Sequence, residues 1–179
     1  AVIFDSARKT FRNDIYSDYK ANRSEAPDDL APQFDYIRKS VLAFNLPSVD
    51  LSNYEADDLI ATYVEKILKI GAKVTIVSSD KDLMQLYKKG VRIFDPMKNK
   101  FISEEDIFTK FGVDASKVID VQSLAGDSSD NVPGVPGIGV KTAAELINKY
   151  GTLEKLLKSA GEIKQNKRRE TLIENKDKA

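Results

Sequence analysis

The sequence contains no cysteine and no histidine among its 179 residues. Without cysteine the chain cannot form disulfides, thiolate zinc sites or a cysteine nucleophile. Without histidine it cannot build a Ser-His-Asp triad, a histidine general base or a histidine-ligated metal site. No apolar run approaches the roughly eighteen residues that a membrane helix needs, so we expect no membrane segment. Any chemistry must therefore use carboxylates, lysines, hydroxyls, the backbone and hard metal ions.

The net charge is zero, because 28 Lys and Arg residues balance 28 Asp and Glu residues. Bulk charge therefore gives no argument for a nucleic-acid partner. The distribution is uneven, however, since residues 151–179 hold eight basic and five acidic residues. A hydrophobic content of 41% predicts a folded chain.

Strand and helix patterns alternate over residues 1–112. Short runs rich in β-branched residues predict strands, and apolar residues at three- and four-residue steps predict helices. This alternation is typical of an open, mostly parallel α/β sheet with flanking helices. Residues 113–179 show only helical patterns and turns, which predicts a helical appendage. The expected strands cover residues 1–5, 73–77 and 91–94, with a strand or loop at 46–49, and the expected helices cover residues 30–44, 54–70 (capped by Asn53), 81–89 and 103–112.

Four acidic motifs stand at the ends of these elements. Acids at helix N-termini can serve simply as caps, and this interpretation is favoured for any one motif alone. The cluster at residues 55–58 holds more acids than a cap needs and has no Lys or Arg within it, so a counter-charge is expected. Oxygen ligands of this kind suit Mg²⁺ or Mn²⁺, and two such ions about 4 Å apart can promote displacement at phosphorus. The candidate metal ligands are Asp5, Glu55, Asp57, Asp58, Asp80, Asp82, Asp127 and Asp130.

A glycine- and proline-rich turn precedes the helix expected at residues 142–150. Its backbone N–H groups can approach a phosphate, and Lys141 and Thr142 add donors at the helix start. The alternative is a plain turn between two helices. We favour a helix-hairpin-helix contact with a nucleic-acid backbone, in which close approach and positive φ angles require glycine. The candidate DNA-binding residues here are Gly134, Gly137, Gly139, Lys141 and Thr142.

Together these motifs, in order along the whole chain, resemble the 5′–3′ exonuclease (flap endonuclease) domain of bacterial DNA polymerase I. The resemblance implies a PIN-like α/β nuclease core over residues 1–112, incomplete at the N-terminus. It implies a helical, helix-hairpin-helix-type DNA-binding subdomain over residues 113–179. It also makes residues 6–26 the arch that admits a single-stranded 5′ end. We expect this polar, basic segment to be mobile in the free protein, because it has no apolar stripe to bury.

The implied activity is hydrolysis of DNA phosphodiesters at 5′ ends and flaps, with two Mg²⁺ or Mn²⁺ ions, in primer removal and repair. Lys20 and Arg23 would bind DNA in the arch and, with Lys81, take part in catalysis. The resemblance further implies a K⁺ ion at the glycine hairpin and DNA with a 5′ flap or nick as partner. It also implies a cytoplasmic location and a polymerase domain in the same polypeptide.

One departure from the family keeps two alternatives open. The family carries an earlier strand with another metal-binding Asp, which this sequence lacks. A DNA-binding fragment without activity is therefore one alternative. A PIN-type ribonuclease is the other, since it would share the acidic sheet end. A pure protein-interaction domain would leave the acidic clusters unexplained.

Overall fold

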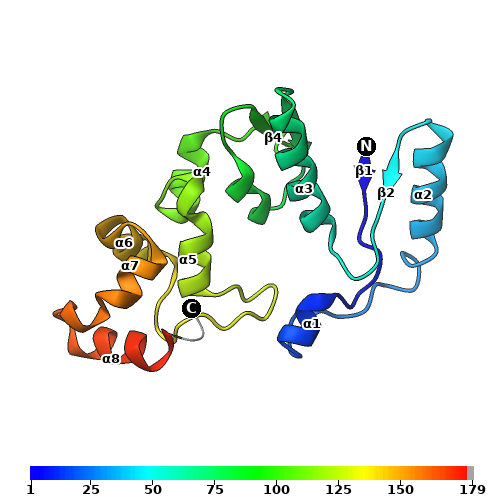
Figure 1. Cartoon of the computed structure of the whole chain (residues 1–179). Helices are drawn as coiled ribbons and strands as arrows, with labels where there is room; N and C mark the ends of the chain where they lie inside the picture. Colours follow the sequence, from blue (N-terminus) through cyan, green and yellow to red (C-terminus); the bar gives the residue numbers. More distant parts are fainter. Residues whose placement is uncertain (177–179) are drawn as a thin grey trace.

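The computed structural model describes residues 1–176 and shows an α/β part followed by a group of helices (Figure 1). The first elements in the chain are β1 (Val2–Ile3), α1 (Phe11–Ile15), α2 (Gln33–Ala43) and β2 (Ser48–Val49). The strands β1 and β2 are parallel neighbours. The helix expected at residues 30–44 is confirmed in its central part, and the segment at 46–49 proves to contain a short strand.

A second sheet follows, built from the most regular strands of the sequence. It comprises β3 (Val74–Val77), β4 (Val91–Asp95) and β5 (Lys100–Phe101), with α3 (Ala56–Lys69) before it and the 3-10 helix η1 (Asp82–Leu86) between β3 and β4. Strands β3 and β4 are parallel, whereas β5 is antiparallel to β4. The α/β class is thus confirmed, but the expected single sheet is not. The strands of residues 1–176 form two separate sheets.

The remaining elements are helical, as the sequence predicts. They are α4 (Glu104–Phe111), η2 (Ala115–Lys117), α5 (Val118–Ala125), α6 (Val140–Tyr150), α7 (Leu153–Lys158), η3 (Ala160–Glu162) and α8 (Asn166–Glu174). The predicted start of α4 is confirmed, because the Ser103 hydroxyl accepts the Asp106 N–H at 3.1 Å. Its predicted end is confirmed as well, since Gly112 adopts a φ of 71°.

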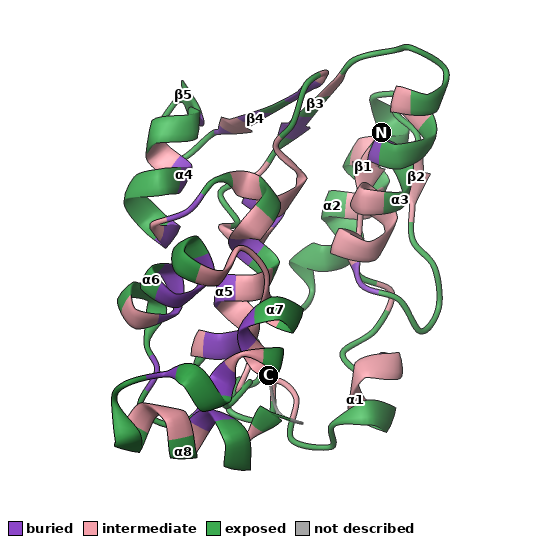
Figure 2. Ribbon diagram, turned by 60° about the vertical axis from the view of Figure 1, so that its left-hand side comes forward, coloured by how far each residue is buried: buried purple, intermediate pink, exposed green. Residues whose placement is uncertain are grey.

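The hydrophobic core belongs to the second sheet and the C-terminal helices (Figure 2). Within residues 1–176, every buried hydrophobic side chain lies between Val64 and Leu172. The strand expected at residues 1–5 is found only as β1, and it lies outside this core, because Val2 and Ile3 are half-buried. Helix α2 likewise has no buried residue. The reason is the size of the first sheet, since two strands of two residues offer little surface for packing.

Two local predictions need correction. Asn53 does not cap α3, because the N-cap is Glu55, which forms a reciprocal capping box with Asp58. The helix expected at residues 81–89 is a short 3-10 helix. None of the helices within residues 1–176 is long and apolar enough to cross a membrane.

Candidate metal and nucleic-acid site

The first acidic group forms where β1 meets the start of α3. Asp5 follows β1, and its Oδ1 accepts the backbone N–H of Ala56 at 2.7 Å. Ala56 is the first residue of α3, directly after Glu55 and just before Asp57. A helix N-terminus favours negative charge. The fold therefore brings Asp5 beside acids that lie far away in the sequence.

The second acidic group follows β3. The Asp80 carboxylate accepts the backbone N–H of Asp82 at 2.8 Å, so it shapes the turn much as a cap does. The Asp82 carboxylate accepts the side-chain amide of Gln122 at 2.5 Å, which connects this turn to α5. Gln122 was not predicted as a site residue, because a single amide in a helix carries no sequence signal.

The two groups influence each other electrostatically. Burial, and after it the negative charges of Asp80, Asp5 and Glu55, together raise the pKa of Asp57 from 3.8 to about 6. Burial also raises the pKa of Asp82, against the hydrogen bond from Gln122. Like charges raise a carboxyl pKa only when they lie close together. These acids thus share one region in which a bound cation would be stabilising.

The third acidic group lies in the loop between α5 and α6. Asp127 is bonded to the ammonium of Lys81, which also lies 3.6 Å from Asp82. Burial alone would raise the pKa of Asp127, but the hydrogen bond and charge of Lys81 lower it overall. Lys81 thereby joins the loop to the turn after β3. This contact brings together two of the predicted acidic motifs.

Basic residues of the arch segment supply the counter-charge that the sequence lacked locally. Arg12 donates two hydrogen bonds to Asp58, at 2.7 and 2.8 Å. These bonds and its charge hold the pKa of Asp58 below its usual range. Lys20 donates to Glu55 at 2.8 Å, and Arg23 pairs with Asp130 at 2.5 Å.

The arch segment was expected to be mobile in the free protein, and its ion pairs in the described structure count against that expectation. The segment contains α1, and three of its five basic side chains are paired with acids at the start of α3 and in the 126–131 loop. Tyr19 adds a further link, since its hydroxyl lies 3.2 Å from Glu55 Oε2 and 3.1 Å from Asp130 Oδ2. The polar composition of the segment predicts that it is exposed to solvent. Its structure depends instead on ion pairs with residues that are distant in the sequence. Sequence reasoning missed Arg12, because pairing across 46 residues leaves no local signal.

The donor set fits a hard divalent cation in its chemistry. It consists of carboxylate oxygens, and burial together with the neighbouring charges of Asp80, Asp5 and Glu55 raises the pKa of Asp57. Within residues 1–176, however, no three acids are placed together so that they could hold an ion as they stand. Five of the predicted ligands are instead engaged by basic side chains, namely Glu55, Asp58, Asp82, Asp127 and Asp130. Cation binding therefore requires some of these pairs to open.

Of the three glycines predicted to bind DNA in the hairpin, one is buried and two are exposed. Gly134 is buried, and a Cβ added there would lie 2.3 Å from the backbone nitrogen of Gly126. It supports the loop and is not on the surface, which corrects its predicted role in DNA contact. Gly137 is exposed with a φ of 75°, so the expected positive φ is found there. Gly139 is exposed but has a φ of −92°, so a positive φ does not explain it.

The end of the hairpin leads into α6 in the expected way. Gly139 is the N-cap residue of α6, and no side chain caps the helix start. Lys141 is exposed in the first turn, and Thr142 beside it is half-buried. This surface therefore offers backbone donors and one cation to an approaching anion.

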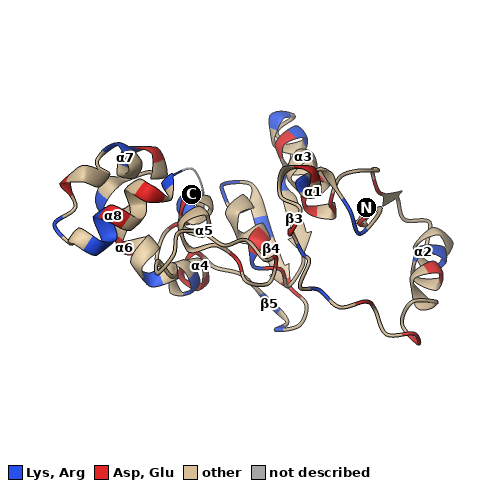
Figure 3. Ribbon diagram, turned by 90° about the horizontal axis from the view of Figure 1, so that it is seen from below, with Lys and Arg blue, Asp and Glu red and all other residues tan. Residues whose placement is uncertain are grey.

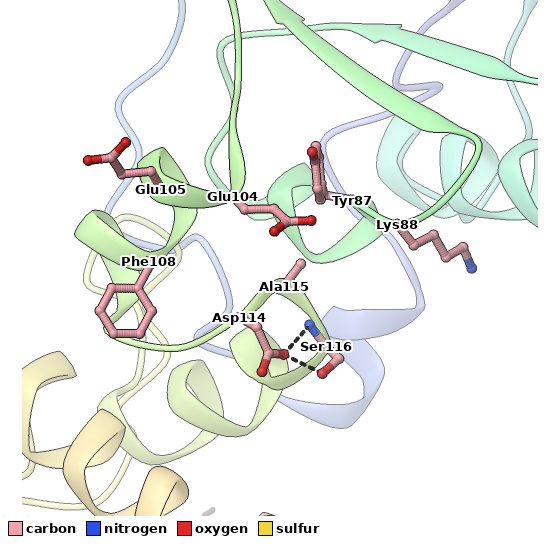
Figure 4. Close-up of a pocket in the computed structure, with 8 residues that line it drawn as sticks. All are labelled: Tyr87, Lys88, Glu104, Glu105, Phe108, Asp114, Ala115 and Ser116. Atoms are coloured by element: carbon pink, nitrogen blue, oxygen red, sulfur yellow. Dashed lines mark hydrogen bonds between the residues drawn. The ribbon is translucent and has the colours of Figure 1, made fainter.

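A hollow of about 550 Å³ lies elsewhere, between residues 87–88 after η1, helix α4 and the start of η2 (Figure 4). Its lining includes three acids, Glu104, Glu105 and Asp114, and the aromatic ring of Phe108. None of the predicted site residues lines it. Its acidic rim is also the wrong charge for a nucleic acid.

Comparison with protein families identifies the chain. Residues 1–112 match the family described as 5′–3′ exonuclease, N-terminal resolvase-like domain. Residues 113–179 match the one described as 5′–3′ exonuclease, C-terminal SAM fold. The chain belongs to the 5′–3′ exonuclease family. This result confirms the resemblance seen in the sequence.

Similar proteins in this family include longer and shorter chains. DNA polymerase I of Rhizobium leguminosarum is 56% identical over 179 residues, which are 100% of this chain and 18% of that protein. A 5′–3′ exonuclease of Aquifex aeolicus is 44% identical over 158 residues, which are 88% of this chain and 55% of that protein. The chain thus spans less than two thirds of the length of these relatives.

Solved structures support the fold. The D15 protein of phage T5, co-crystallised with metal ions, aligns with a TM-score of 0.85 at 24% identity, covering 99% of this chain and 71% of that one. A T5 D15 flap endonuclease in a complex with DNA and metal ions aligns with a TM-score of 0.84, covering 99% of this chain and 69% of that one, again at 24% identity. At this identity the likeness establishes the fold and does not assign individual residues. Proteins of this fold have thus been crystallised with divalent metal ions and DNA.

Proposed function

We propose that this chain is the nuclease part of a DNA polymerase I-type protein and hydrolyses DNA phosphodiesters at 5′ ends, flaps and nicks. The observation that carries the proposal is the meeting of acids from three segments: Asp5 Oδ1 accepts the Ala56 N–H at 2.7 Å, and the charges of Asp80, Asp5 and Glu55 add to burial in raising the pKa of Asp57 to about 6. A cluster of this kind at the carboxyl ends of strands is typical of a catalytic centre. Family membership supports the same reaction. A cytoplasmic location and a polymerase domain in the same polypeptide belong to this proposal.

The proposed ligands of two Mg²⁺ or Mn²⁺ ions are the eight predicted carboxylates. When bound, the divalent ions supply Lewis acidity and neutralise charge on the scissile phosphate. The mutual repulsion around Asp57 supports a role for this residue near the centre of the site.

The basic residues have two proposed roles. In the free protein Lys20 and Arg23 neutralise Glu55 and Asp130. When divalent metal ions bind Glu55 and Asp130, the Lys20 and Arg23 side chains become available to bind the phosphates of a threaded 5′ end. Lys81 stays protonated, since hydrogen bonding to Asp127 and the nearby acids raise its pKa although burial opposes this. It would hold the 126–131 loop against the turn after β3.

The glycine hairpin is the proposed contact with duplex DNA. Exposed Gly137 and Gly139 allow backbone approach, and Lys141 adds one cation. None of these groups can read base edges by paired hydrogen bonds, so binding should be independent of base sequence. The turn carbonyls are the proposed site of a K⁺ ion. The proposed division into a nuclease core (1–112) and a DNA-binding part (113–179) follows from this arrangement.

The proposal is tested with a labelled 5′-flap DNA in buffers containing Mg²⁺, Mn²⁺ or EDTA. We expect cleavage near the flap junction with either metal and none with EDTA. Asp80→Asn should abolish cleavage, while Asp28→Asn, at an exposed acid outside the site, should not. Absence of metal-dependent cleavage in the wild type would leave only a DNA-binding fragment. Faster cleavage of single-stranded RNA than of flap DNA would indicate a ribonuclease.

A further inference from the structure

We propose that the buried acid Asp95 is a positioning residue for the proposed metal ligand Asp80, and that it acts through the hydroxyl of Ser79. The inference rests on the proposed function, because it takes Asp80 as a ligand of a divalent ion. Neither Asp95 nor Ser79 is one of the eight predicted ligands. Their role is to fix the end of β3, from which the Asp80 carboxylate projects.

Asp95 is the last residue of β4 and the most deeply buried charged residue within residues 1–176. Its exposed fraction is 2%, and the other buried polar residues of this range are Thr10 and Glu55. Charge alone does not single it out, since Asp and Glu are mixed with Lys and Arg around β3 and β4 (Figure 3). A buried carboxylate is costly unless hydrogen bonds replace those it made to water. Its partners therefore indicate what it does.

The partners of Asp95 fall into a local and a distant group. Its Oδ1 accepts the backbone N–H groups of Met97 at 3.0 Å and Lys98 at 3.2 Å, and these bonds close the turn after β4. The Lys98 ammonium lies 3.2 Å from Oδ2, but its side chain is 64% exposed, so this ion pair contributes little. The distant partner is the Ser79 hydroxyl, which donates to Oδ1 at 2.8 Å across 16 residues. The turn itself does not require this last bond.

The Ser79 bond acts at the point where β3 leaves the sheet. The parallel pairing of β3 with β4 extends to Val77 and Phe94. The backbone N–H of Ser78 still donates to the Phe94 carbonyl at 3.0 Å, and the Ser78 hydroxyl accepts the Asp80 N–H at 3.0 Å. The two residues before Asp80 are therefore both held to the end of β4, one through its backbone and one through its side chain.

The position of Asp80 matters because few of the predicted ligands are ready to receive a cation. Five of the eight form ion pairs with basic side chains. The other three, Asp5, Asp57 and Asp80, form none within residues 1–176, so they can turn to a cation without breaking such a pair. They come from three different elements, and ligands bind a small ion well only when their supporting contacts fix them in place. The bond between Ser79 and Asp95 supplies such a contact for Asp80.

The test compares two Ser→Ala variants that each remove a hydroxyl from an aspartate. Ser79→Ala removes the bond to Asp95, and Ser103→Ala removes the 3.0 Å bond to Asp106 in the capping box of α4, which holds none of the predicted ligands. Binding of Mn²⁺ to the DNA-free protein is titrated by electron paramagnetic resonance. We expect Ser79→Ala to weaken Mn²⁺ binding about tenfold, because residues that support metal ligands typically contribute this much or more to affinity. Ser103→Ala should leave the affinity unchanged, although loss of the cap lowers the melting midpoint.

Conservative variants separate positioning from general stability. Ser79→Thr keeps the hydroxyl, and Asp95→Asn keeps an oxygen that can accept from it, so both should bind Mn²⁺ like wild type. Asp95→Ala should lose as much affinity as Ser79→Ala. In flap cleavage by Ser79→Ala, the half-saturating Mn²⁺ concentration should rise while the KM for DNA stays unchanged.

The outcomes distinguish the inference from the proposed function. If wild type and a folded Ser79→Ala protein bind Mn²⁺ equally tightly, the inference fails while the metal site stands. Equal losses of affinity in Ser79→Ala and Ser103→Ala, or no recovery in Ser79→Thr, would also overturn it, because the effect would then not depend on the bond to Asp95. If wild type shows no saturable Mn²⁺ binding, the proposed metal site fails and the inference fails with it.

Discussion

Lys20 donates a hydrogen bond to Glu55 at 2.8 Å, and its ammonium also lies 3.8 Å from Asp130. A single cation of the arch segment thus bridges an acid at the start of α3 and an acid of the 126–131 loop. Both acids are predicted metal ligands. The arrangement indicates that Lys20 neutralises these two acids in the free protein and must release them when divalent ions bind.

Replacing Lys20 with methionine should therefore have opposite effects on the free and the metal-bound protein. The pair is only partly exposed, with side-chain exposures of 18% and 10%. Removing the ammonium should lower the free energy of unfolding in EDTA by about 2 kcal/mol, between the values typical of exposed and buried pairs. The gain in melting temperature on adding Mn²⁺ should be larger than in wild type. Lys9→Met, at an exposed site, is the control, and equal behaviour of the two variants would disprove the bridge.

Replacing Asp57 or its neighbour Asp58 with the uncharged asparagine should change the free energy of unfolding in opposite directions. The pKa of Asp57 is raised from 3.8 to about 6, so the folded state binds its proton more tightly than the unfolded state does. The free energy of unfolding therefore falls as the pH rises from about 4 to about 6, and this loss of stability remains at higher pH. Asp57→Asn should stabilise the protein in EDTA near neutral pH and remove this part of the pH dependence.

Asp58 provides the matched comparison. Its pKa is lowered by hydrogen bonds from Arg12, so its stabilising contribution is present above the unfolded value and is lost at lower pH. Asp58→Asn should destabilise the protein near neutral pH. Urea unfolding of both variants at several pH values tests the pair. Destabilisation by Asp57→Asn in EDTA would contradict the electrostatic account.

The loop carrying Asp127 and Asp130 should depend on a close backbone contact at Gly134. A Cβ there would lie 2.3 Å from Gly126, at a φ of 60°. Gly134→Ala should cost about 3 kcal/mol or more, because both a backbone clash and a left-handed conformation must be accommodated. Gly137→Ala, at a φ of 75° in open space, should cost only about 1–2 kcal/mol. Similar costs in denaturant unfolding would show that the close contact is unimportant.

Lys141→Ala should weaken duplex binding evenly across base sequences. It removes one phosphate contact from the hairpin surface, so the salt slope should fall by about one unit. Fluorescence anisotropy with several duplexes of different sequence measures both effects. A change that varied strongly with base sequence would assign Lys141 to base readout instead.

The sequence predicted most of the regular elements and the acids of the site, because both carry local signals. The strands at β3 and β4 and the capping box at Ser103 are examples. It could not predict the division into two sheets or the exposure of α2, since burial depends on how much surface the neighbouring strands supply. It also missed the pairing of Arg12 with Asp58, which joins residues 46 positions apart. The order of the arch segment follows from such tertiary pairs and not from its composition.

Direct titration of Mn²⁺ by electron paramagnetic resonance tests the central claim that these acids form a divalent-cation site. We predict saturable binding to wild type, loss of that binding in an Asp57→Asn/Asp80→Asn variant, and tighter binding in Lys20→Met, where the competing ammonium is gone. Binding that was weak and non-saturable in wild type, or unchanged in the double variant, would contradict the account.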